Sequence, residues 1–114
     1  MAIWRCSLVE ESNSLLKNLL VVGGSGFIGK WVVLEGIKRG YDVTVISSKL
    51  VNKDHRVKNV EYLTADINCQ SELKKNISFK KFTHVVNLGG YINHSHYLTG
   101  GRNTLDVHFN GLLN

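Results

Sequence analysis

Three spaced glycines follow a short apolar run near the start of this chain. Residues 19 to 33 read LLVVGGSGFIGKWVV, so the first apolar run ends at a glycine and a second one follows the last glycine. An apolar run closed by glycine is typical of a buried parallel strand, and glycine permits turns that other residues resist. The stretch therefore predicts a strand, a tight loop and a helix in direct succession.

Further strands and helices alternate along the rest of the chain. After the first strand at 18–22, runs rich in β-branched residues predict strands at 41–47, 60–66 and 83–88. Helical spacing predicts three helices: one from Phe27 to Ile37 with Gly40 as its C-terminal cap, one at 69–77 capped by Asn68, and one at 103–114 with an apolar face. The residues of that apolar face are Leu105, Phe109, Leu112 and Leu113.

This alternation indicates the fold class. Strands that alternate with helices form right-handed βαβ units around a parallel sheet. We therefore expect an α/β fold, a doubly wound parallel sheet of the Rossmann type with spatial order 3-2-1-4, over residues 17–114. Residues 1–16 are weakly patterned, and we expect them to form an N-terminal arm or a short helix.

Composition excludes several classes of protein. The chain of 114 residues is 43% hydrophobic and 20% charged, as in ordinary globular domains, and no apolar run approaches the ~18 residues of a membrane helix. A signal peptide is not expected, because Glu10 and Glu11 interrupt the segment where its apolar region would lie. Cys6 and Cys69 form neither a disulfide framework nor a metal site. We expect a reduced, cytoplasmic protein with no membrane contact.

The net charge of +5 is spread over the whole chain. Nucleic-acid binding would favour an arginine-rich stripe with interleaved aromatic residues, and neither pattern occurs. We interpret the charge as a basic surface that helps attract an anionic cofactor, and we expect no nucleic-acid partner.

The glycines of the first loop suit a phosphate site. A helix N-terminus offers unpaired N–H groups and a partial positive charge, and side chains in the loop would keep phosphates away. Gly23 can make the turn, Gly26 can admit the ligand, and Gly29 can allow close packing of helix and strand. Two spacings fit, because Gly24, Gly26 and Gly29 also form G-x-G-x-x-G. The alternative is a glycine-rich turn without a ligand.

The segment VVGGSGFIG closely resembles the nucleotide-binding loop of the extended short-chain dehydrogenase/reductase superfamily, of the NAD-dependent epimerase/dehydratase type. That family favours G-x-x-G-x-x-G, which assigns Gly23, Gly26 and Gly29. The resemblance extends over residues 18–114, through TADI, VVNLGG and VHFNGLLN. It implies a cofactor site made of Gly23, Ser25, Gly26, Phe27, Ile28, Gly29, Asp66, Ile67, Leu88, Gly89 and Gly90.

Within this resemblance, some positions carry specific implications. Asp66 takes the place of the family's carboxylate beside the adenine amino group, and Leu88, Gly89 and Gly90 that of the segment along the ribose. In the last helix, His108 replaces the family's first Asn and Leu112 its Thr, so the role of that Asn is not carried over.

The form of the cofactor depends on the end of the second predicted strand. NAD enzymes usually carry a carboxylate there, bonded to the ribose 2′-hydroxyl. This chain has Ser47, Ser48 and Lys49, whose hydroxyls and ammonium suit a 2′-phosphate. The site could therefore take NAD or NADP, and the residues favour NADP. The alternative role for Lys49 is that of a solvated loop residue.

The family's catalytic pair, a Tyr with a Lys four residues later, does not occur in this chain. In the family the Lys lowers the Tyr pKa so that the phenol exchanges a proton while hydride moves. Val45, Asp66, Ser95 and Gly101 stand four residues after the four tyrosines, Tyr41, Tyr62, Tyr91 and Tyr97. We therefore predict no catalytic residues here, and expect the catalytic and sugar-binding half to be missing.

Other polar residues support no second site. His94 and His96 lie two apart but lack a third ligand, so we expect a solvated loop and no metal. His55 and His84 lack an arranged partner. Tyr91 and Asn93 could touch substrate in a longer form, or serve as plain loop residues.

Two functions remain open. The first is the NAD(P)-binding N-terminal part of a nucleotide-sugar epimerase, dehydratase or reductase, inactive alone, with a nucleotide-sugar substrate only in a longer form. The second is a stand-alone dinucleotide-binding or regulatory module without chemistry. In either case we expect the fourth predicted strand to leave an open sheet edge and to permit self-association.

Overall fold

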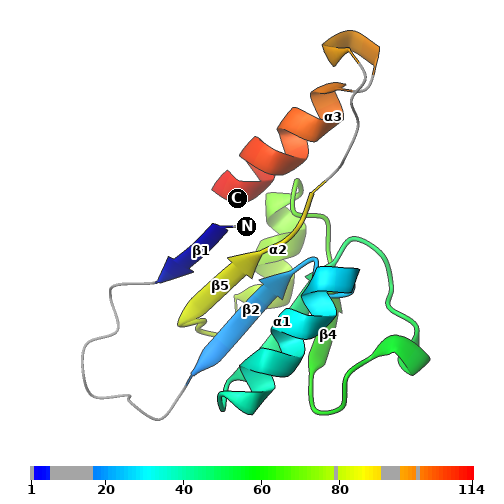
Figure 1. The fold of residues 1–114 in the computed structure, drawn as a ribbon. Coiled ribbons are helices and arrows are strands. Elements are labelled where there is room, and N and C mark those ends of the chain that lie inside the picture. The colour runs from blue at the N-terminus through cyan, green and yellow to red at the C-terminus, as the bar shows by residue number, and fades with distance from the viewer. Residues whose placement is uncertain (1, 6–16, 79, 91–95, 100) are drawn as a thin grey trace.

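The computed structural model describes residues 2–5, 17–78, 80–90, 96–99 and 101–114. Its centre is a five-stranded sheet in the order β1-β5-β2-β3-β4, with helices on both faces (Figure 1). The strands are β1 (Ala2–Arg5), β2 (Asn18–Val22), β3 (Asp42–Ser47), β4 (Glu61–Thr64) and β5 (His84–Asn87). The predicted order 3-2-1-4 is confirmed, because β4, β3, β2 and β5 are neighbours and all pair in parallel.

Strand β1 was not expected. It pairs antiparallel with the outer edge of β5, with Ala2 opposite Asn87 and Arg5 opposite His84. The expectation of an open edge at 83–88 is therefore wrong, because β1 provides the missing partner for the backbone groups of β5. Within the predicted arm of residues 1–16, the described part is this strand and not a helix.

The parallel strands alternate their side chains between two cores. Leu19, Val21, Val43 and Val45 pack with Val33 of α1 (Phe27–Lys38) on one face. On the other face Leu20, Ile46 and Ala65 pack with Leu73 of α2 (Gln70–Ile77). Because successive strand residues point to opposite faces, a strand covered on both sides reads as a continuous apolar run. This explains NLLVV and DVTVIS, and makes the sheet doubly wound.

Helix α1 faces the sheet with a different stripe from the one its apolar residues suggest. Gly29, Val33 and Gly36 are its buried residues, whereas Phe27 and Trp31 are 85% and 63% exposed. Glycine lets the helix approach closely, since a Cβ at Gly36 would lie 2.8 Å from Leu19 Cδ2. The helix ends at Lys38 with Arg39 as its C-cap, and the predicted glycine, Gly40, follows with a φ of 80° and an N–H bond to the Ile37 carbonyl, which completes a left-handed cap.

Helix α2 begins one residue later than its predicted cap implies. Cys69, and not Asn68, is the N-cap, and no side chain bonds the first turn there. Asn68 instead donates its N–H to Asp66 Oδ1 at 2.9 Å. The side chain of Asp66 thereby stabilises the turn between β4 and α2.

The last helical segment lies above the sheet (Figure 1). It follows a 3-10 turn, η2 (Tyr97–Thr99), and comprises α3 (Gly101–Leu105), a π-helical turn η3 (Asp106–Asn110) and α4 (Gly111–Leu113). The predicted apolar face is present, but Leu105, Phe109, Leu112 and Leu113 are between 42% and 71% exposed. Together with Phe27 and Trp31, they leave large apolar surfaces open on the described part of the chain.

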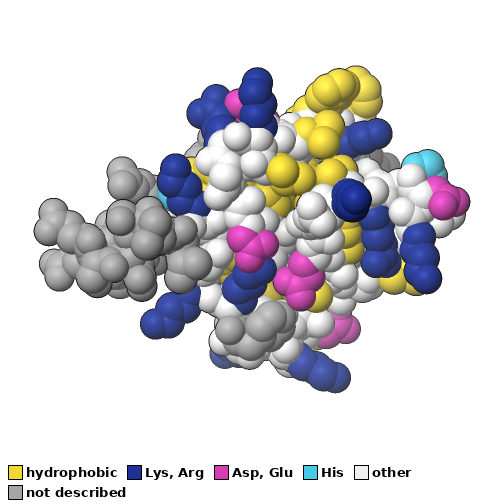
Figure 2. Space-filling model, turned by 90° about the horizontal axis from the view of Figure 1, so that it is seen from below, with side chains coloured by type: hydrophobic (Ala, Val, Ile, Leu, Met, Phe, Trp, Pro, Cys, Tyr) yellow, Lys and Arg dark blue, Asp and Glu magenta, His cyan; other side chains and the backbone are white. Residues whose placement is uncertain are grey.

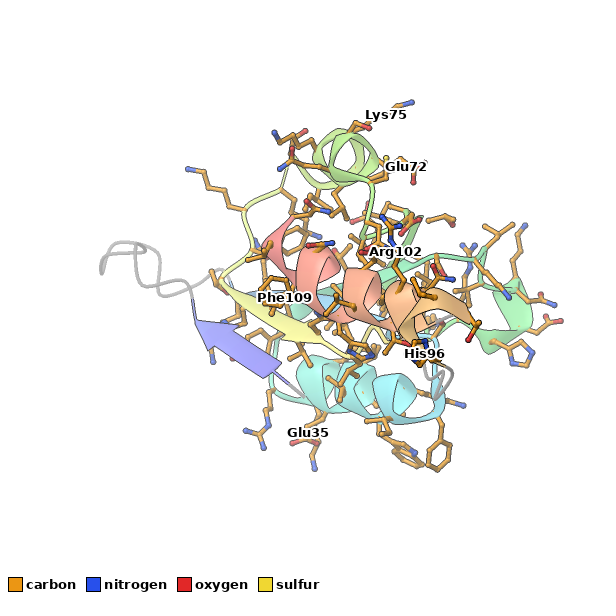
Figure 3. The ribbon with its side chains drawn as sticks, turned by 90° about the horizontal axis from the view of Figure 1, so that it is seen from above. Glu35, Glu72, Lys75, His96, Arg102 and Phe109 are labelled. Carbon is orange, nitrogen blue, oxygen red and sulfur yellow. The ribbon has the colours of Figure 1, made fainter. Side chains whose placement is uncertain are left out.

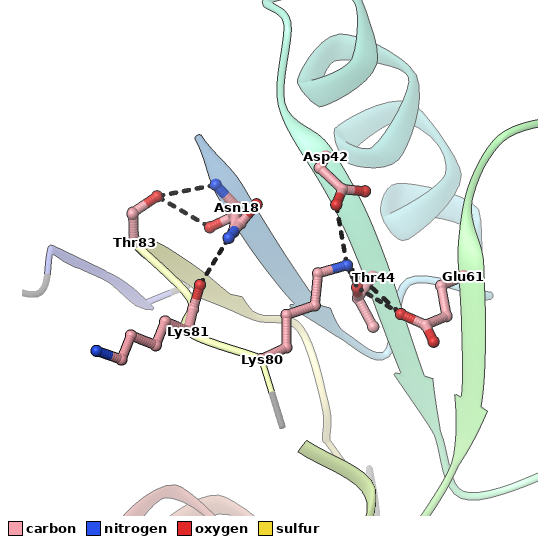
Figure 4. A network of polar contacts seen from close by, with 7 residues as sticks. All are labelled: Asn18, Asp42, Thr44, Glu61, Lys80, Lys81 and Thr83. Atoms are coloured by element: carbon pink, nitrogen blue, oxygen red, sulfur yellow. Dashed lines mark hydrogen bonds and ion pairs between the residues drawn. The ribbon is translucent and has the colours of Figure 1, made fainter. Parts of the chain in front are cut away.

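Polar contacts lock the amino ends of the strands together. Lys80 Nζ lies 2.9 Å from Thr44 Oγ1, 3.0 Å from Asp42 Oδ2 and 3.5 Å from Glu61 Oε2 (Figure 4). Beside it, Asn18 Nδ2 donates to the Lys81 carbonyl at 2.8 Å. These contacts hold residues 80–81, which lead into β5, against the amino ends of β2, β3 and β4.

Charged side chains are interspersed on this side of the molecule. Seen from below, Lys and Arg occupy separate places with Asp and Glu between them, and they do not form one basic stripe (Figure 2). No helix in the described ranges is long and apolar enough to cross a membrane.

Candidate functional site

The glycine loop lies between the carboxyl end of β2 and the start of α1. Gly23 has a φ of 77° and donates its N–H to the Ile46 carbonyl at 2.8 Å, which ties the loop to β3. Gly26 is the N-cap of α1, and it has no side chain to bond the N–H groups of the first turn, which also contains no acidic residue. These N–H groups and the helix dipole make the loop attractive to an anion.

The three glycines of the G-x-x-G-x-x-G spacing have different surroundings. A Cβ at Gly23 would lie 3.0 Å from the Gly89 nitrogen, and one at Gly29 would lie 2.6 Å from the Gly23 carbonyl oxygen. Both glycines are therefore required by the protein's own packing. At Gly26 the nearest atom would be 3.6 Å away, and its φ of −75° suits any residue.

Gly24, the first glycine of the alternative spacing, is buried beneath the loop. A Cβ there would meet both methyl groups of Val45 at 2.9 Å. Gly24 therefore serves contact with the sheet, while the positive φ lies at Gly23. The positive φ at Gly23 agrees with the turn expected at the first glycine of G-x-x-G-x-x-G, while the role of the three glycines in binding stays a prediction.

A cavity of about 410 Å³ opens at the carboxyl ends of β2, β3 and β4. It brings together predicted residues from four separate segments of the sequence. Those that line it are Gly23, Ser25, Gly26, Ser47, Ser48, Lys49, Asp66, Ile67, Leu88, Gly89 and Gly90.

A second cavity, of about 950 Å³, shares the glycine loop and the segment 88–90 with the first. The remaining predicted residues, Phe27, Ile28 and Gly29, line it. Gly23, Gly26 and the segment 88–90 border both cavities, so the glycine loop lies between them, and the two neighbouring cavities are called the two-part cleft below.

Polar side chains in the first cavity are held by local bonds. Ser47, nearly buried at the end of β3, donates its hydroxyl to Ser25 Oγ at 2.9 Å and so joins the glycine loop to the next strand. Ser48 and Lys49 are exposed. The N–H of Asp66 donates to Glu72 Oε2 at 3.0 Å, which joins the end of β4 to α2. A cation and a carboxylate thus stand in the same cavity.

The last helical segment forms a wall that the sequence did not predict. Seen from above, it crosses between α1 and α2 (Figure 3). Val107 lines the first cavity, and His108 and Leu112 line the second. A Cβ at Gly90 would lie 2.8 Å from His108 Cε1, and Asn114 Nδ2 donates to the Ile67 carbonyl at 2.9 Å. In the sequence, the glycines at 90 and 111 were the features that could have indicated this wall, because each glycine leaves room for a close neighbour.

Other candidate residues lie apart from the cleft. Tyr91, Asn93 and His94 fall outside the described residues. His96 is exposed, and His84 contacts Tyr41 edge to face at the amino end of β5. Within the described ranges, no three His, Cys, Asp or Glu side chains are grouped closely enough to hold a metal ion.

The two-part cleft suits an extended ligand with an anionic centre, and its chain segments match a known family. The sequence profile of the NAD dependent epimerase/dehydratase family matches residues 19–114. The chain belongs to this family. The profile begins at the second residue of β2 and includes every segment that lines the cleft, whereas β1 lies outside it.

Curated relatives include two plant enzymes. The chain is 29% identical over 90 residues to the bifunctional UDP-glucose 4-epimerase and UDP-xylose 4-epimerase 3 of Arabidopsis thaliana, covering 68% of this chain and 26% of that protein. It is 28% identical over 86 residues to the corresponding enzyme 1 of Pisum sativum, covering 65% and 25%. The chain thus spans about a quarter of the length of these relatives.

Solved structures agree on the fold. The UDP-glucose 4-epimerase of Thermotoga maritima, solved with UDP-glucose, superposes with a TM-score of 0.72 at 24% identity, over 84% of this chain and 31% of that one. The Thermus thermophilus UDP-glucose 4-epimerase, solved with NAD, gives a TM-score of 0.69 at 24% identity over the same shares. These likenesses establish the Rossmann-type arrangement of the four parallel strands.

Proposed function

We propose that this chain is the dinucleotide-binding N-terminal part of a nucleotide-sugar epimerase, dehydratase or reductase. The observation that carries the proposal is Gly26. The fold does not need glycine there, since a Cβ would meet nothing closer than 3.6 Å and the backbone conformation is ordinary. A pyrophosphate lying on the uncapped first turn of α1 does need it, because a side chain would occupy its place.

The cleft fits the two halves of a dinucleotide on either side of Gly26. The adenosine half would occupy the cavity with Asp66 and Ile67, and the nicotinamide half the one with Phe27 and Ile28. The bound cofactor would supply hydride transfer. The chain's own contribution is to bind and orient it, and the epimerase relatives support this role.

Calorimetric titration of NAD and NADP into the wild type and Gly26→Val tests the proposal. We expect the β-branched side chain to weaken both dinucleotides at least about tenfold by blocking the pyrophosphate, while circular dichroism shows an unchanged fold. Ile67→Val is a control for mild change elsewhere in the cleft. Equal affinity in folded Gly26→Val would contradict the assigned loop.

For the form of the cofactor, we propose that NADP binds more tightly than NAD. No carboxylate stands among Ser47, Ser48 and Lys49 at the end of β3, and Lys49 lines the cavity with its exposed ammonium. We expect Lys49→Glu to weaken NADP by about five- to tenfold and NAD much less, because the change places a charge beside the 2′-phosphate.

Lys58→Glu is the matched control for that experiment, because it makes the same charge change at an exposed residue outside the cleft. A wild type that prefers NAD, or an equal loss of NADP affinity in both variants, would refute the assignment of Lys49.

We further propose that these 114 residues turn over no nucleotide sugar alone. Positioned proton transfer contributes about 10²- to 10⁴-fold in rate, and no tyrosine of the chain has a lysine four residues later. Incubation with NADH or NADPH and a panel of nucleotide sugars should give neither absorbance change nor epimerised product, while a full-length epimerase gives product under the same conditions. Multiple turnover would refute the proposal. A cytoplasmic location stays a prediction.

A stand-alone binding module is the second candidate, and β1 favours it. A doubly wound sheet of order 3-2-1-4-5-6 places a fifth strand beside the fourth. Here β1 occupies that edge of β5. Reading the coding sequence downstream of Asn114 distinguishes the candidates, because an in-frame Tyr-x-x-x-Lys segment would support the first.

A further inference from the structure

We propose that Asn87, the last residue of β5, is a further ligand-binding residue of the cleft, and that its side-chain amide donates to the ribose of the nicotinamide half of the dinucleotide. The inference rests on the proposed function, which assigns that half to the second cavity. Asn87 lines the second cavity and not the first. It is absent from the site residues that the sequence predicted.

One hydrogen bond fixes the orientation of the Asn87 amide. The N–H of Gly89, two residues further along the chain, donates to Asn87 Oδ1 at 2.9 Å, as in an Asx turn. A backbone N–H can donate only to the oxygen of a side-chain amide, because the NH2 group has donors and no acceptor. The oxygen is therefore held by the turn, and the NH2 group is directed away from the Gly89 N–H.

This NH2 group makes no hydrogen bond within the part of the chain that the structure describes. No described residue accepts from Asn87 Nδ2, although Asn87 is half-buried. Every buried side-chain nitrogen or oxygen in the described ranges has a partner, so Nδ2 is not sealed inside the core. Two donors held in a fixed direction on a cavity wall are available to a ligand.

The second cavity offers few other polar side chains. Asn87 and His108 are the polar side chains among its described lining residues, and the large apolar ones are Phe27, Ile28, Leu88 and Leu112. In a mostly apolar pocket, a small number of polar groups fix the orientation of the ligand. A flat nicotinamide ring suits the apolar walls, whereas the hydroxyl groups of a ribose require hydrogen-bond partners such as an amide.

The place of Asn87 beside the glycine loop indicates which part of the ligand it meets. In the β2–β5 register Asn87 is opposite Val22, the residue before Gly23, and the N–H of Leu88 donates to the Val22 carbonyl at 2.8 Å. The proposed pyrophosphate lies at this loop, which borders both cavities. In a dinucleotide, a ribose follows each phosphate. The first group to enter the second cavity from the loop is therefore the ribose of the nicotinamide half.

The test compares three ligands of increasing length in calorimetric titrations. ADP ends at the pyrophosphate, ADP-ribose adds the ribose, and NAD adds the nicotinamide. Asn87→Asp retains an oxygen for the Gly89 N–H but has no NH2 group, and Asn87→Leu removes both groups without adding charge. The matched controls are Asn52→Asp and Asn52→Leu, because Asn52 Oδ1 also accepts an N–H two residues along the chain, from Asp54, and Asn52 lines neither cavity.

The quantity that decides is the affinity of each ribose-bearing ligand divided by the affinity of ADP. We expect this ratio to fall about fivefold in both Asn87 variants, for ADP-ribose and for NAD alike, because both variants lose one hydrogen bond to the ribose. Both Asn52 variants should keep the wild-type ratio. Amide exchange at Gly89, measured by NMR, should remain slow in Asn87→Asp and become faster in Asn87→Leu, which separates the ribose contact from the turn.

The other outcomes contradict the inference in distinguishable ways. A wild type that binds none of the three ligands would refute the proposed function and this inference with it. A wild type that binds them, with unchanged ratios in both Asn87 variants, would refute the role of Asn87 alone. A fall in only one variant would assign the effect to the lost turn or to the added charge, and a fall for NAD without ADP-ribose would place the acceptor on the nicotinamide. Each of these last two results would refute donation to the ribose.

Discussion

The amino and carboxyl ends of the parallel strands differ in how their polar groups are arranged: ion pairs fill one end, and a cleft opens at the other. At the amino ends, the protein's own side chains complete one another, with Lys80 between Thr44, Asp42 and Glu61 (Figure 4). At the carboxyl ends, glycines and exposed backbone border a two-part cleft. The contrast teaches that polarity alone does not mark a site. The candidate site is instead marked by open space at a glycine, because the fold would permit a side chain at Gly26.

Glycines at the carboxyl ends are themselves of two kinds, and the largest expected effect on stability separates them. In Gly29→Ala, the new Cβ would lie 2.6 Å from backbone atoms of Gly23 and Gly24, which cannot move without opening the loop. We expect a loss of about 3 kcal/mol in the free energy of unfolding, as for severe overpacking, measured by urea denaturation. Wild-type stability would mean that α1 does not pack closely on the loop.

At the amino ends, Lys80→Met should have a smaller effect. The substitution removes the ammonium that joins three polar groups but retains the apolar stem, and Asp42 and Glu61 are exposed enough to be solvated. We expect a loss of about 1 kcal/mol in the free energy of unfolding.

Lys81→Met is the matched control for Lys80→Met, because its side chain is exposed and only its backbone carbonyl bonds Asn18. Dinucleotide affinity should remain unchanged in both variants. Weaker dinucleotide binding in Lys80→Met alone would show that the two ends of the sheet are energetically coupled. The two ends would then not have separate roles.

Gly26→Ser should change stability less again, and in the opposite direction. Ser is a better N-cap than Gly by a few tenths of a kcal/mol, and the backbone of Gly26 already has extended angles. We expect a slightly more stable protein that binds NAD and NADP more weakly, because the added side chain enters the cleft. A stable variant with undiminished affinity would remove the main support for the proposed function.

The sequence predicted the parallel sheet and the glycine loop because their signals are local. An apolar run that ends at Gly23 identifies β2, and a β-branched run that follows Gly40 identifies β3. The same two glycines mark the turn at Gly23 and the cap at Gly40. The predicted cofactor residues at 66–67 and 88–90 came from the resemblance to the family, and the carboxyl ends of the parallel strands bring them to one edge of the sheet. Their role in binding a cofactor stays a prediction.

Features that depend on distant partners were not predictable in this way. β1 has only four residues, AIWR, and its pairing depends on the free edge of β5. The packing face of α1 does not follow its large apolar residues, because Phe27 and Trp31 are exposed and the contact with the sheet uses Gly29 and Gly36. Val107 and His108 reach the cleft only because a π-helical turn crosses above the sheet.

The smallest effect is expected on the solvent side of α1, where Glu35 and Arg39 form an ion pair at 2.7 Å with 49% and 69% of their side chains exposed. The hydrogen bond and charge of Arg39 lower the pKa of Glu35. A carboxyl group with a lowered folded pKa stabilises the fold above its unfolded pKa, and the contribution is lost as pH falls through the folded value.

Glu35→Gln should therefore be barely distinguishable from the wild type near pH 7 in physiological salt, because water and ions screen an exposed pair. Any small difference should fade as the pH falls below the ordinary glutamate value of 4.5. Thermal denaturation of both proteins across this range, with Arg39→Met closing a double-mutant cycle, measures the pair. The Lys80 side chain is only 19% exposed, and we expect its contacts to stabilise the protein more than the exposed pair of Glu35 and Arg39 does. A Glu35–Arg39 coupling free energy as large as the effect of Lys80→Met would contradict this expectation.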